Sequence, residues 1–173
     1  SWAKYYFGNY QLYQPRSIDD IKELISKNPK LIPSGGFRSY GDSAINEVII
    51  NSKYFNKIIN FDVEKGILKA ESGITINEMI KFLLPKGWFL NVTPGTKFAT
   101  LGGCIASDVH GKEHHKDGCF SKNLIKIKLL INKQDVIEFD STSHPDLFQA
   151  TCGGMGLTGF IIDAEIQCKK IKS

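Results

Sequence analysis

Three histidines lie within six residues of one another and could bind a metal ion. His110, Glu113 and His114 match HxxEH, the pattern of an inverted zinc-peptidase site. That chemistry needs a helix that brings both histidines to one face, with the glutamate acting as general base. Gly111 lies inside the motif, no apolar stripe supports a helix there, and no third ligand stands out, although His144 is available. The sequence therefore gives a metal-dependent hydrolase little support, and stoichiometric zinc in the purified protein is the test of that hypothesis.

His110 differs from the two histidines that follow it. It ends the apolar stretch 104–109, and this position predicts a side chain that faces inward toward a site. A histidine there could orient a substrate or move a proton near neutral pH. The alternative is a structural histidine that supports the loop. His114 and His115 are expected to lie on an exposed loop.

Glycines gather in five clusters, at 35–41, 95, 102–103, 111–118 and 153–159. Glycine permits a positive φ and lets backbone N–H groups approach a ligand closely. Each cluster alone is typical of a turn. Five of them in one small domain favour a large ligand that is cradled by backbone.

Residues 154–159 match GxGxxG, which in a dinucleotide-binding fold follows a strand and opens a helix. Here a helical pattern precedes the motif and a β-rich run, 160–166, follows it. We therefore expect a tight turn with close backbone packing rather than a Rossmann site. The sequence also lacks the GxSxG elbow of serine hydrolases and the GxxxxGK[ST] loop that binds phosphate.

Hydrophobic spacing predicts the elements that position these loops. Capping-box-like starts predict one helix from Ser17 and another from Thr75. The remaining expected elements are strands at 30–33, 47–51, 57–61, 67–71 and 160–168, a hairpin of 124–132 with 136–140, a short helix at 145–150 and a loop-rich region at 91–121. The aromatic-rich segment 5–13 is an edge strand, a docking arm or a set of side chains packed on the core. Helices and strands interleave, so the fold class is α/β or α+β.

Composition excludes several classes of protein. A chain of 173 residues with 42% hydrophobic and 23% charged residues is typical of one globular domain, or at most two small ones. The net charge of +4 comes from scattered lysines, whereas a nucleic-acid footprint needs clustered basic residues. No apolar run is long enough to span a membrane, and no signal-peptide pattern begins the chain. Four cysteines without a CxxC pair predict free thiols and a cytoplasmic location.

Taken together, the loops resemble the FAD-binding domain of the vanillyl-alcohol oxidase / p-cresol methylhydroxylase family of flavoproteins. The similar segments are the Pro-x-Ser entry into the first helix at 15–17, the loop 33–42 (PSGGFRSYGD), PGT at 94–96 with TLGG at 100–103, and the glycine turn 151–159. Within the family, RSYGD at 38–42 and ASDVHGKEHH at 106–115 are similar to the decaprenylphosphoryl-β-D-ribose oxidase group. That group usually has Cys at the place of Ser107 and Asn at the place of Glu113, so the chain is expected to be a divergent member.

The resemblance implies an α+β, PCMH-type fold of two small α/β subdomains that hold FAD between them. The cofactor-binding residues that it implies are Pro33, Ser34, Gly35, Gly36, Phe37, Arg38, Ser39, Tyr40, Gly41, Asp42, Ser43, Gly95, Thr96, Thr100, Leu101, Gly102, Gly103, Ser107, Asp108, Val109, His110 and Ile161. Backbone N–H groups can hold the doubly charged pyrophosphate without a basic patch. His110 is the residue expected to act beside the flavin ring.

Many relatives carry a histidine in the first loop that bonds covalently to the flavin. The matching position here is Arg38, which offers no comparable nucleophile, so we expect FAD to be bound non-covalently. An attachment through Cys119 matches no position of the family.

The resemblance also implies a function. Residues 1–173 are expected to be the FAD-binding domain of an enzyme whose C-terminal substrate-binding domain lies outside this chain, so this part alone is expected to be inactive. The intact enzyme is expected to oxidise a sugar secondary alcohol, the ribose 2-hydroxyl of a polyprenyl-phosphoryl ribose, by hydride transfer to flavin N5. The keto sugar would pass to a partner reductase, and a lipid-linked substrate would place the enzyme at a membrane periphery. The alternative is an aldonolactone or sugar-alcohol oxidase of the same superfamily, which would release peroxide.

Overall fold

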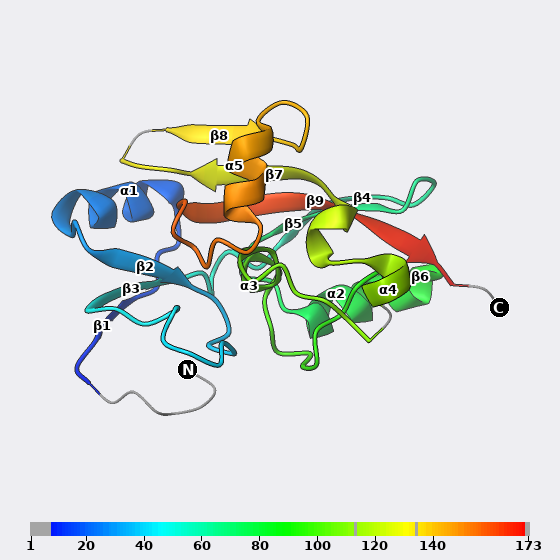
Figure 1. Cartoon of the computed structure of the whole chain (residues 1–173), viewed down its shortest axis with the longest axis horizontal. Helices are drawn as coiled ribbons and strands as arrows, with labels where there is room; N and C mark the ends of the chain where they lie inside the picture. Colours follow the sequence, from blue (N-terminus) through cyan, green and yellow to red (C-terminus); the bar gives the residue numbers. More distant parts are fainter. Residues whose placement is uncertain (1–7, 113, 134, 172–173) are drawn as a thin grey trace.

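The computed structural model describes residues 8–112, 114–133 and 135–171, and these form two sheets packed side by side (Figure 1). The mixture of helices and strands confirms the α+β prediction. The first sheet is small and parallel, and the second is larger and antiparallel.

The small sheet contains β1 (Gln11–Tyr13), β2 (Leu31–Ser34) and β3 (Val48–Asn51), in the order β1-β3-β2. Helix α1 (Ile18–Lys27) links β1 to β2 and begins with the predicted capping box, in which Ser17 and Asp20 exchange backbone-to-side-chain hydrogen bonds. Its buried Ile21 packs on Ile50 of β3. The aromatic-rich segment ends in the exposed edge strand β1, and residues 5–7 lie outside the described part of the chain.

The large sheet has the order β4-β5-β9-β7-β8. Its strands are β4 (Ile58–Asp62), β5 (Ile67–Glu71), β9 (Phe160–Lys170), β7 (Leu124–Leu130) and β8 (Val136–Phe139), and β6 (Trp88–Leu90) pairs with the far end of β9. Strand β9 is the centre of this sheet because it pairs with β5 and β7 along its length.

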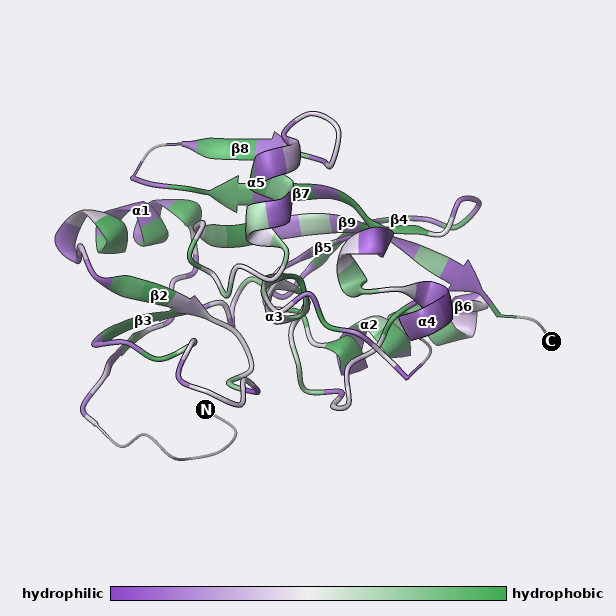
Figure 2. Ribbon diagram, viewed as in Figure 1, coloured by the Kyte–Doolittle hydropathy of each residue, from purple (hydrophilic) through white to green (hydrophobic). Residues whose placement is uncertain are grey.

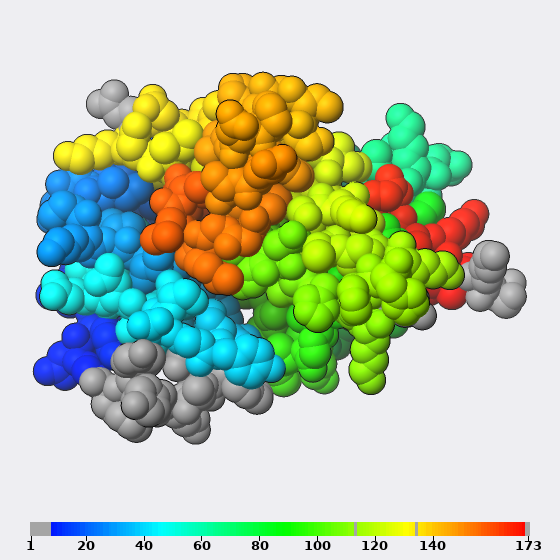
Figure 3. Space-filling model, viewed as in Figure 1, coloured from blue at the N-terminus to red at the C-terminus, as the bar shows by residue number. Residues whose placement is uncertain are grey.

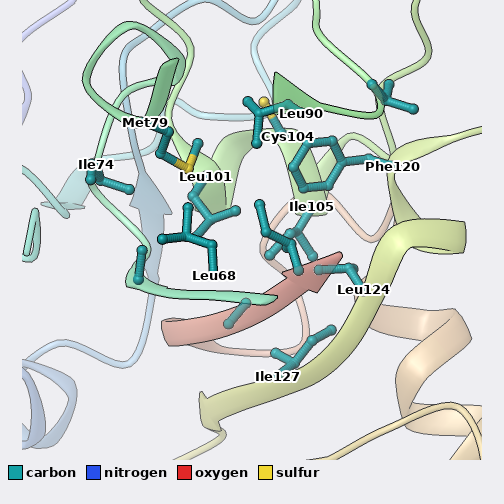
Figure 4. Close-up of a cluster of buried hydrophobic side chains, with 14 of the residues drawn as sticks. Leu68, Ile74, Met79, Leu90, Leu101, Cys104, Ile105, Phe120, Leu124 and Ile127 are labelled. Atoms are coloured by element: carbon teal, nitrogen blue, oxygen red, sulfur yellow. The ribbon is translucent and has the colours of Figure 1, made fainter. Parts of the chain in front are cut away.

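The hydrophobic core lies between this sheet and the helices α2 (Ile76–Leu83) and α3 (Leu101–Ala106). Figure 4 shows side chains of both helices, among them Met79, Leu101 and Ile105, packed toward Leu68 of β5 and Ile127 of β7. The remaining helical segments are η1 (Leu84–Lys86), α4 (His114–Asp117), η2 (Phe120–Asn123) and α5 (Pro145–Thr151). Helix α4 is hydrophilic throughout (Figure 2).

Most of the predicted elements are present within one or two residues of their expected bounds. The loop-rich prediction for 91–121 is wrong in part, because α3, α4 and the start of η2 lie there. The turn predicted at 154–159 is confirmed, with positive φ at Gly156 and Gly159, and a Cβ on Gly159 would collide with the carbonyl oxygen of Leu130. All four cysteines are free.

Candidate functional site

A cleft runs between the two sheets, where the predicted glycine loops meet. It has two adjoining parts, one of about 590 Å³ and a smaller one of about 70 Å³, which we call the inner pocket. The cleft walls come from the first loop (33–44), the segment 94–100, helix α3 and the turn 155–161. Figure 3 shows the first loop, in blue and cyan, beside the orange atoms of that turn.

Buried Asn51, at the end of β3, fixes the first loop. Its Nδ2 donates to the carbonyl oxygens of Ser34, at 3.1 Å, and Gly35, at 2.7 Å. The backbone N–H of Ser52 also donates to the Ser34 carbonyl, at 2.9 Å. Phe37 has a φ of 54°, a strained value for a bulky residue. The hydrogen bonds from Asn51 and Ser52 therefore fix the first residues of the loop at the edge of the cleft.

Helix α3 is held against the end of β5. Thr100 caps the helix by accepting from the N–H of Gly103, at 3.2 Å, and the N–H of Gly102 donates to the Ser72 carbonyl, at 2.7 Å. A Cβ on Gly102 would lie 2.9 Å from the Cβ of Ser72, and a Cβ on Gly35 would collide with the Thr100 hydroxyl. These glycines are required because the walls of the cleft touch here.

The turn after α5 closes the inner pocket. Its N–H groups at Gly153 and Met155 donate to the carbonyl oxygens of Ile105 and Ala106, at 3.0 and 2.8 Å. Met155 has a φ of 52°, and its sulfur lies 3.8 Å from the Ser107 hydroxyl. The turn is thus tied to the end of α3, and both contribute to one wall.

The inner pocket is lined by serine hydroxyls and carries no charged side chain of the described residues. The six serines are at positions 34, 39, 43, 52, 72 and 107. Two of these hydroxyls, on Ser34 and Ser72, are buried without a hydrogen-bond partner among the described residues. The other serine hydroxyls and the glycine backbone match a ligand rich in acceptor oxygens, such as a diphosphate.

A sequence model of the family described as "FAD binding domain" matches residues 11–140. The chain belongs to this FAD-binding family. FAD is therefore its cofactor, and the glycine- and serine-lined cleft fits the diphosphate and ribose of that molecule.

Curated relatives agree with this assignment. The chain is 36% identical to decaprenylphosphoryl-beta-D-ribose oxidase of Mycolicibacterium smegmatis over 79% of its length, which is 30% of that protein. It is 28% identical to L-gulonolactone oxidase of Mus musculus over 97% of its length, which is 39% of that protein. The chain thus spans about a third of the length of these relatives.

Solved structures share the fold. The chain superposes on alkyldihydroxyacetonephosphate synthase with a TM-score of 0.81 and 21% sequence identity, over 95% of this chain and 32% of that one. The predicted family and fold are confirmed.

The structure brings most of the predicted cofactor-binding residues of this FAD-binding domain into the cleft. Asp42, Leu101, Asp108 and His110 do not line it. Leu101 is fully buried in the core. The carboxylate of Asp108 accepts hydrogen bonds from the N–H and the hydroxyl of Ser121, at 2.8 and 3.0 Å, so it fixes the loop after α3.

The expectation that His110 faces inward is wrong, because its side chain is exposed. Asp108 has a φ of 38°, and this left-handed residue turns the chain, so the apolar pattern of α3 does not continue to His110. The His110 side chain instead lines a second pocket of about 810 Å³, together with Lys112, His114 and others. The ring centres of His110 and His114 are 5.2 Å apart.

The second pocket adjoins the cleft. Pro94 and Gly95 line both, so the segment that carries them is a shared wall. Two of its lining residues, Lys169 and Asp117, form an ion pair at 3.1 Å. His110 therefore lies beside the cofactor cleft rather than inside it.

The described residues hold no group of three side chains that could bind a metal ion. Glu113, which the HxxEH hypothesis needs, lies outside them. His114 and His115 are exposed, as expected, on the single turn of α4. No helix among the described residues is long and apolar enough to cross a membrane.

Several lining residues were not predicted. They are Ala44, Ser52, Ser72, Pro94, Phe98, Ala99, Cys104, Ala106, Met155, Gly156, Gly159 and Phe160. Pro94 and the glycine turn belong to segments whose resemblance to the family was recognised. Ser72 gave only a weak signal, a small residue between a strand and a helix cap.

Proposed function

We propose that these residues form the FAD-binding half of an oxidoreductase that acts on the CH–OH group of a sugar, with FAD lying in the cleft. The observation that carries this is the juxtaposition of two pockets: a glycine- and serine-lined cleft and, across Pro94 and Gly95, a pocket that contains His110. Bound FAD supplies a hydride acceptor. The backbone of 33–43 and 94–103 would hold the cofactor, and Ile161 would pack on it.

The second pocket is the proposed place for the reacting end of the substrate. Lys112 gives it positive potential, whereas the charge of Lys169 is offset by Asp117. The imidazole of His110 is exposed in this pocket, so it can orient a sugar hydroxyl and accept its proton. The remaining substrate contacts are proposed to lie in a separate substrate-binding domain.

We propose non-covalent binding of FAD. No histidine of the described residues lines the cleft. Cys104 does line it, but burial raises the pKa of this thiol to about 12, so it remains protonated and a poor nucleophile. Cys119 lies outside the cleft, in an isolated backbone bridge with His110.

The proposed substrate is a polyprenyl-phosphoryl ribose, oxidised at its 2-hydroxyl to a keto sugar that a partner reductase would consume. The 36% identity to decaprenylphosphoryl-beta-D-ribose oxidase supports it. The second candidate is an aldonolactone, because L-gulonolactone oxidase and D-arabinono-1,4-lactone oxidase match 96–97% of this chain.

The test is anaerobic flavin reduction in the full-length protein, with a polyprenyl-phosphoryl ribose and two aldonolactones as substrates. The proposal expects bleaching by the ribose lipid and none by the lactones, and the reverse result would assign the second candidate. Fast oxygen consumption with peroxide release would also favour the lactone oxidase. His110→Ala should slow reduction while leaving FAD bound, and Lys116→Ala, on the exposed side of α4, is the matched control. Unchanged reduction in His110→Ala would make this histidine structural.

A further inference from the structure

Asn91 lies on the wall of the second pocket, directly after β6, and was not predicted as a site residue. It lines this pocket together with His110 and Lys112. Three positions further along the chain is Pro94, which lines both the second pocket and the cofactor cleft. Asn91 therefore belongs to the same stretch of wall that separates the two pockets, and its side chain is available to whatever occupies the second one.

The orientation of the Asn91 amide is fixed by its neighbours. Its Nδ2 donates to Oδ1 of Asn123, at 2.7 Å, and to the backbone carbonyl of Gln167, at 3.2 Å. The amide of Asn123 is fixed in turn, because its Nδ2 donates to the backbone carbonyl of Cys119, at 3.3 Å. Backbone carbonyls only accept, so exchanging N and O in either amide would place two acceptor oxygens against each other. Both N–H groups of Asn91 are therefore used within the chain.

The oxygen of the same amide is unused. Among the described residues, nothing donates to Oδ1 of Asn91. The side chain is partly buried, and its oxygen is not fully enclosed, so a group in the pocket can reach it. An amide oxygen accepts hydrogen bonds and does not donate them, which limits its partners to donors such as a hydroxyl or an ammonium group.

The charge of the pocket favours a hydroxyl over an ammonium group. Among the described lining residues, Lys112 contributes a positive charge, whereas the charges of Lys169 and Asp117 offset each other. A positive pocket repels an ammonium ligand, while a neutral hydroxyl is unaffected. A sugar carries several hydroxyls. His110 is the proposed partner of the one that is oxidised, so the fixed oxygen of Asn91 is left for another.

We propose that Oδ1 of Asn91 accepts a hydrogen bond from a sugar hydroxyl other than the one that is oxidised, and that this bond contributes to the choice of sugar. The inference rests on the proposed function, because it takes the second pocket as the site of the sugar. An acceptor that is already fixed binds a hydroxyl without first losing side-chain entropy. A neutral hydrogen bond of this kind is expected to contribute about fivefold in affinity.

The experiment measures the binding of sugars that lack the hydroxyl proposed to be oxidised. It uses the full-length protein with FAD bound and follows the absorbance change of the oxidised flavin. The probes are the 2-deoxyribose analogue of a polyprenyl-phosphoryl ribose and two forms of it that also lack either the 3-hydroxyl or the 5-hydroxyl. In the wild type, one of these two losses should raise Kd about fivefold. In Asn91→Leu, the parent probe should bind about fivefold more weakly, and loss of that hydroxyl should have no further effect.

Asn91→Asp separates sugar binding from a structural role. This variant keeps an acceptor oxygen but replaces both N–H donors by a carboxylate oxygen that faces Asn123 and the Gln167 carbonyl. It should therefore melt at a lower temperature than the wild type. Loss of the hydroxyl should nevertheless still raise Kd fivefold or more, because the acceptor remains. If Asn91 only supported the end of β6, Asn91→Asp would respond to the loss of the hydroxyl no more than Asn91→Leu.

Asn28→Leu is the matched control. Asn28 is also partly buried, and its Nδ2 donates to a backbone carbonyl, that of Leu24, at 2.9 Å. It lies at the end of α1, beside the small sheet and outside the second pocket. This control should lower the melting temperature and leave the Kd values of the three probes unchanged.

Three outcomes overturn the inference. A wild type that binds all three probes equally would show that neither hydroxyl is recognised. An equal effect of the lost hydroxyl in wild type and Asn91→Leu would remove Asn91 from the sugar site while leaving the proposed function intact. Wild-type protein that holds FAD, binds none of the probes and is not reduced by the polyprenyl-phosphoryl ribose would remove the proposed function, and this inference with it.

Discussion

Replacing Asn51 by aspartate tests whether one buried amide holds the first loop of the cleft. The substitution keeps the shape of the side chain but removes both N–H donors. In the wild type these N–H groups bond the carbonyl oxygens of Ser34 and Gly35, and Oδ1 accepts from the N–H of Lys53 at 3.2 Å. The aspartate would still accept from the N–H of Lys53, but its second carboxylate oxygen would face the carbonyl oxygens of Ser34 and Gly35.

The magnitude follows from the groups left without partners. The Ser34 carbonyl keeps its bond from the Ser52 N–H, whereas the Gly35 carbonyl loses the Asn51 donor. An unsatisfied buried group costs about 1–3 kcal/mol, and repulsion between the carboxylate and the carbonyls adds to it, so we expect a loss of about 3 kcal/mol. For a chain of this size that loss corresponds to a fall in melting temperature of roughly 6–10 °C.

Thermal unfolding of the flavin-free and flavin-bound protein measures the effect. Because the first loop lines the cleft, FAD affinity should fall as well, by tenfold or more. Asn60→Asp, at an exposed position of β4, is the matched control and should change the melting temperature by about 1 °C or less. If Asn51→Asp melts within 2 °C of wild type and binds FAD equally well, the buried amide does not hold the loop and the reasoning is refuted.

Three further predictions follow from the same contacts. Gly35→Ala should weaken FAD binding at least tenfold in a fluorescence titration, since its Cβ would displace the Thr100 side chain, and equal binding by the variant would contradict this. Acid precipitation should release all flavin into the supernatant, and yellow colour retained in the pellet would contradict non-covalent binding. Lys126, whose Nζ lies 3.1 Å from the Glu138 carboxylate, lowers the pKa of Glu138, and Lys69 adds to the effect. The stabilisation from the Lys126–Glu138 ion pair is therefore present above the ordinary pKa of 4.5 and is lost as the pH falls through the lowered pKa. Lys126→Met should therefore cost about 0.5 kcal/mol at pH 7 in low salt and progressively less as the pH is lowered into the acid range, and a loss that does not change with pH would contradict the assignment.

Local signals predicted the elements that form from neighbouring residues. Ser17 with Asp20, and Thr75 with Glu78, each form the reciprocal bonds of a capping box, and these bonds need only four consecutive residues. Helix α3 gave no such signal because it contains Gly102 and Gly103, which disfavour a helix. It forms because the cap at Thr100 and the bond from Gly102 to Ser72 hold it against the large sheet, and sequence spacing does not reveal a contact of that kind.

The same limit explains the errors at the site. His110 was expected to face inward because apolar residues precede it, but the left-handed Asp108 between them changes the direction of the chain. Ser72 was not predicted because all other residues that line its pocket are 20 or more positions away in the sequence. The turn after α5 was predicted because the positive φ values of Gly153, Gly156 and Gly159 favour glycine wherever they occur.

The glycines have a second role that the sequence does not reveal. A Cβ on Gly35 would collide with Thr100, and one on Gly102 would crowd Ser72, so these positions bring two chain segments together whether or not a ligand is present. A larger residue at either position would therefore separate the walls of the cleft as well as obstruct the ligand. Because the first loop belongs to the small sheet while α3 and Ser72 pack with the large one, cofactor affinity and the contact between the sheets depend on the same atoms. A ligand that binds only while the two walls are in contact stabilises that contact, and it does so more strongly the more tightly it binds. FAD should therefore raise the melting temperature of the whole domain rather than order one loop.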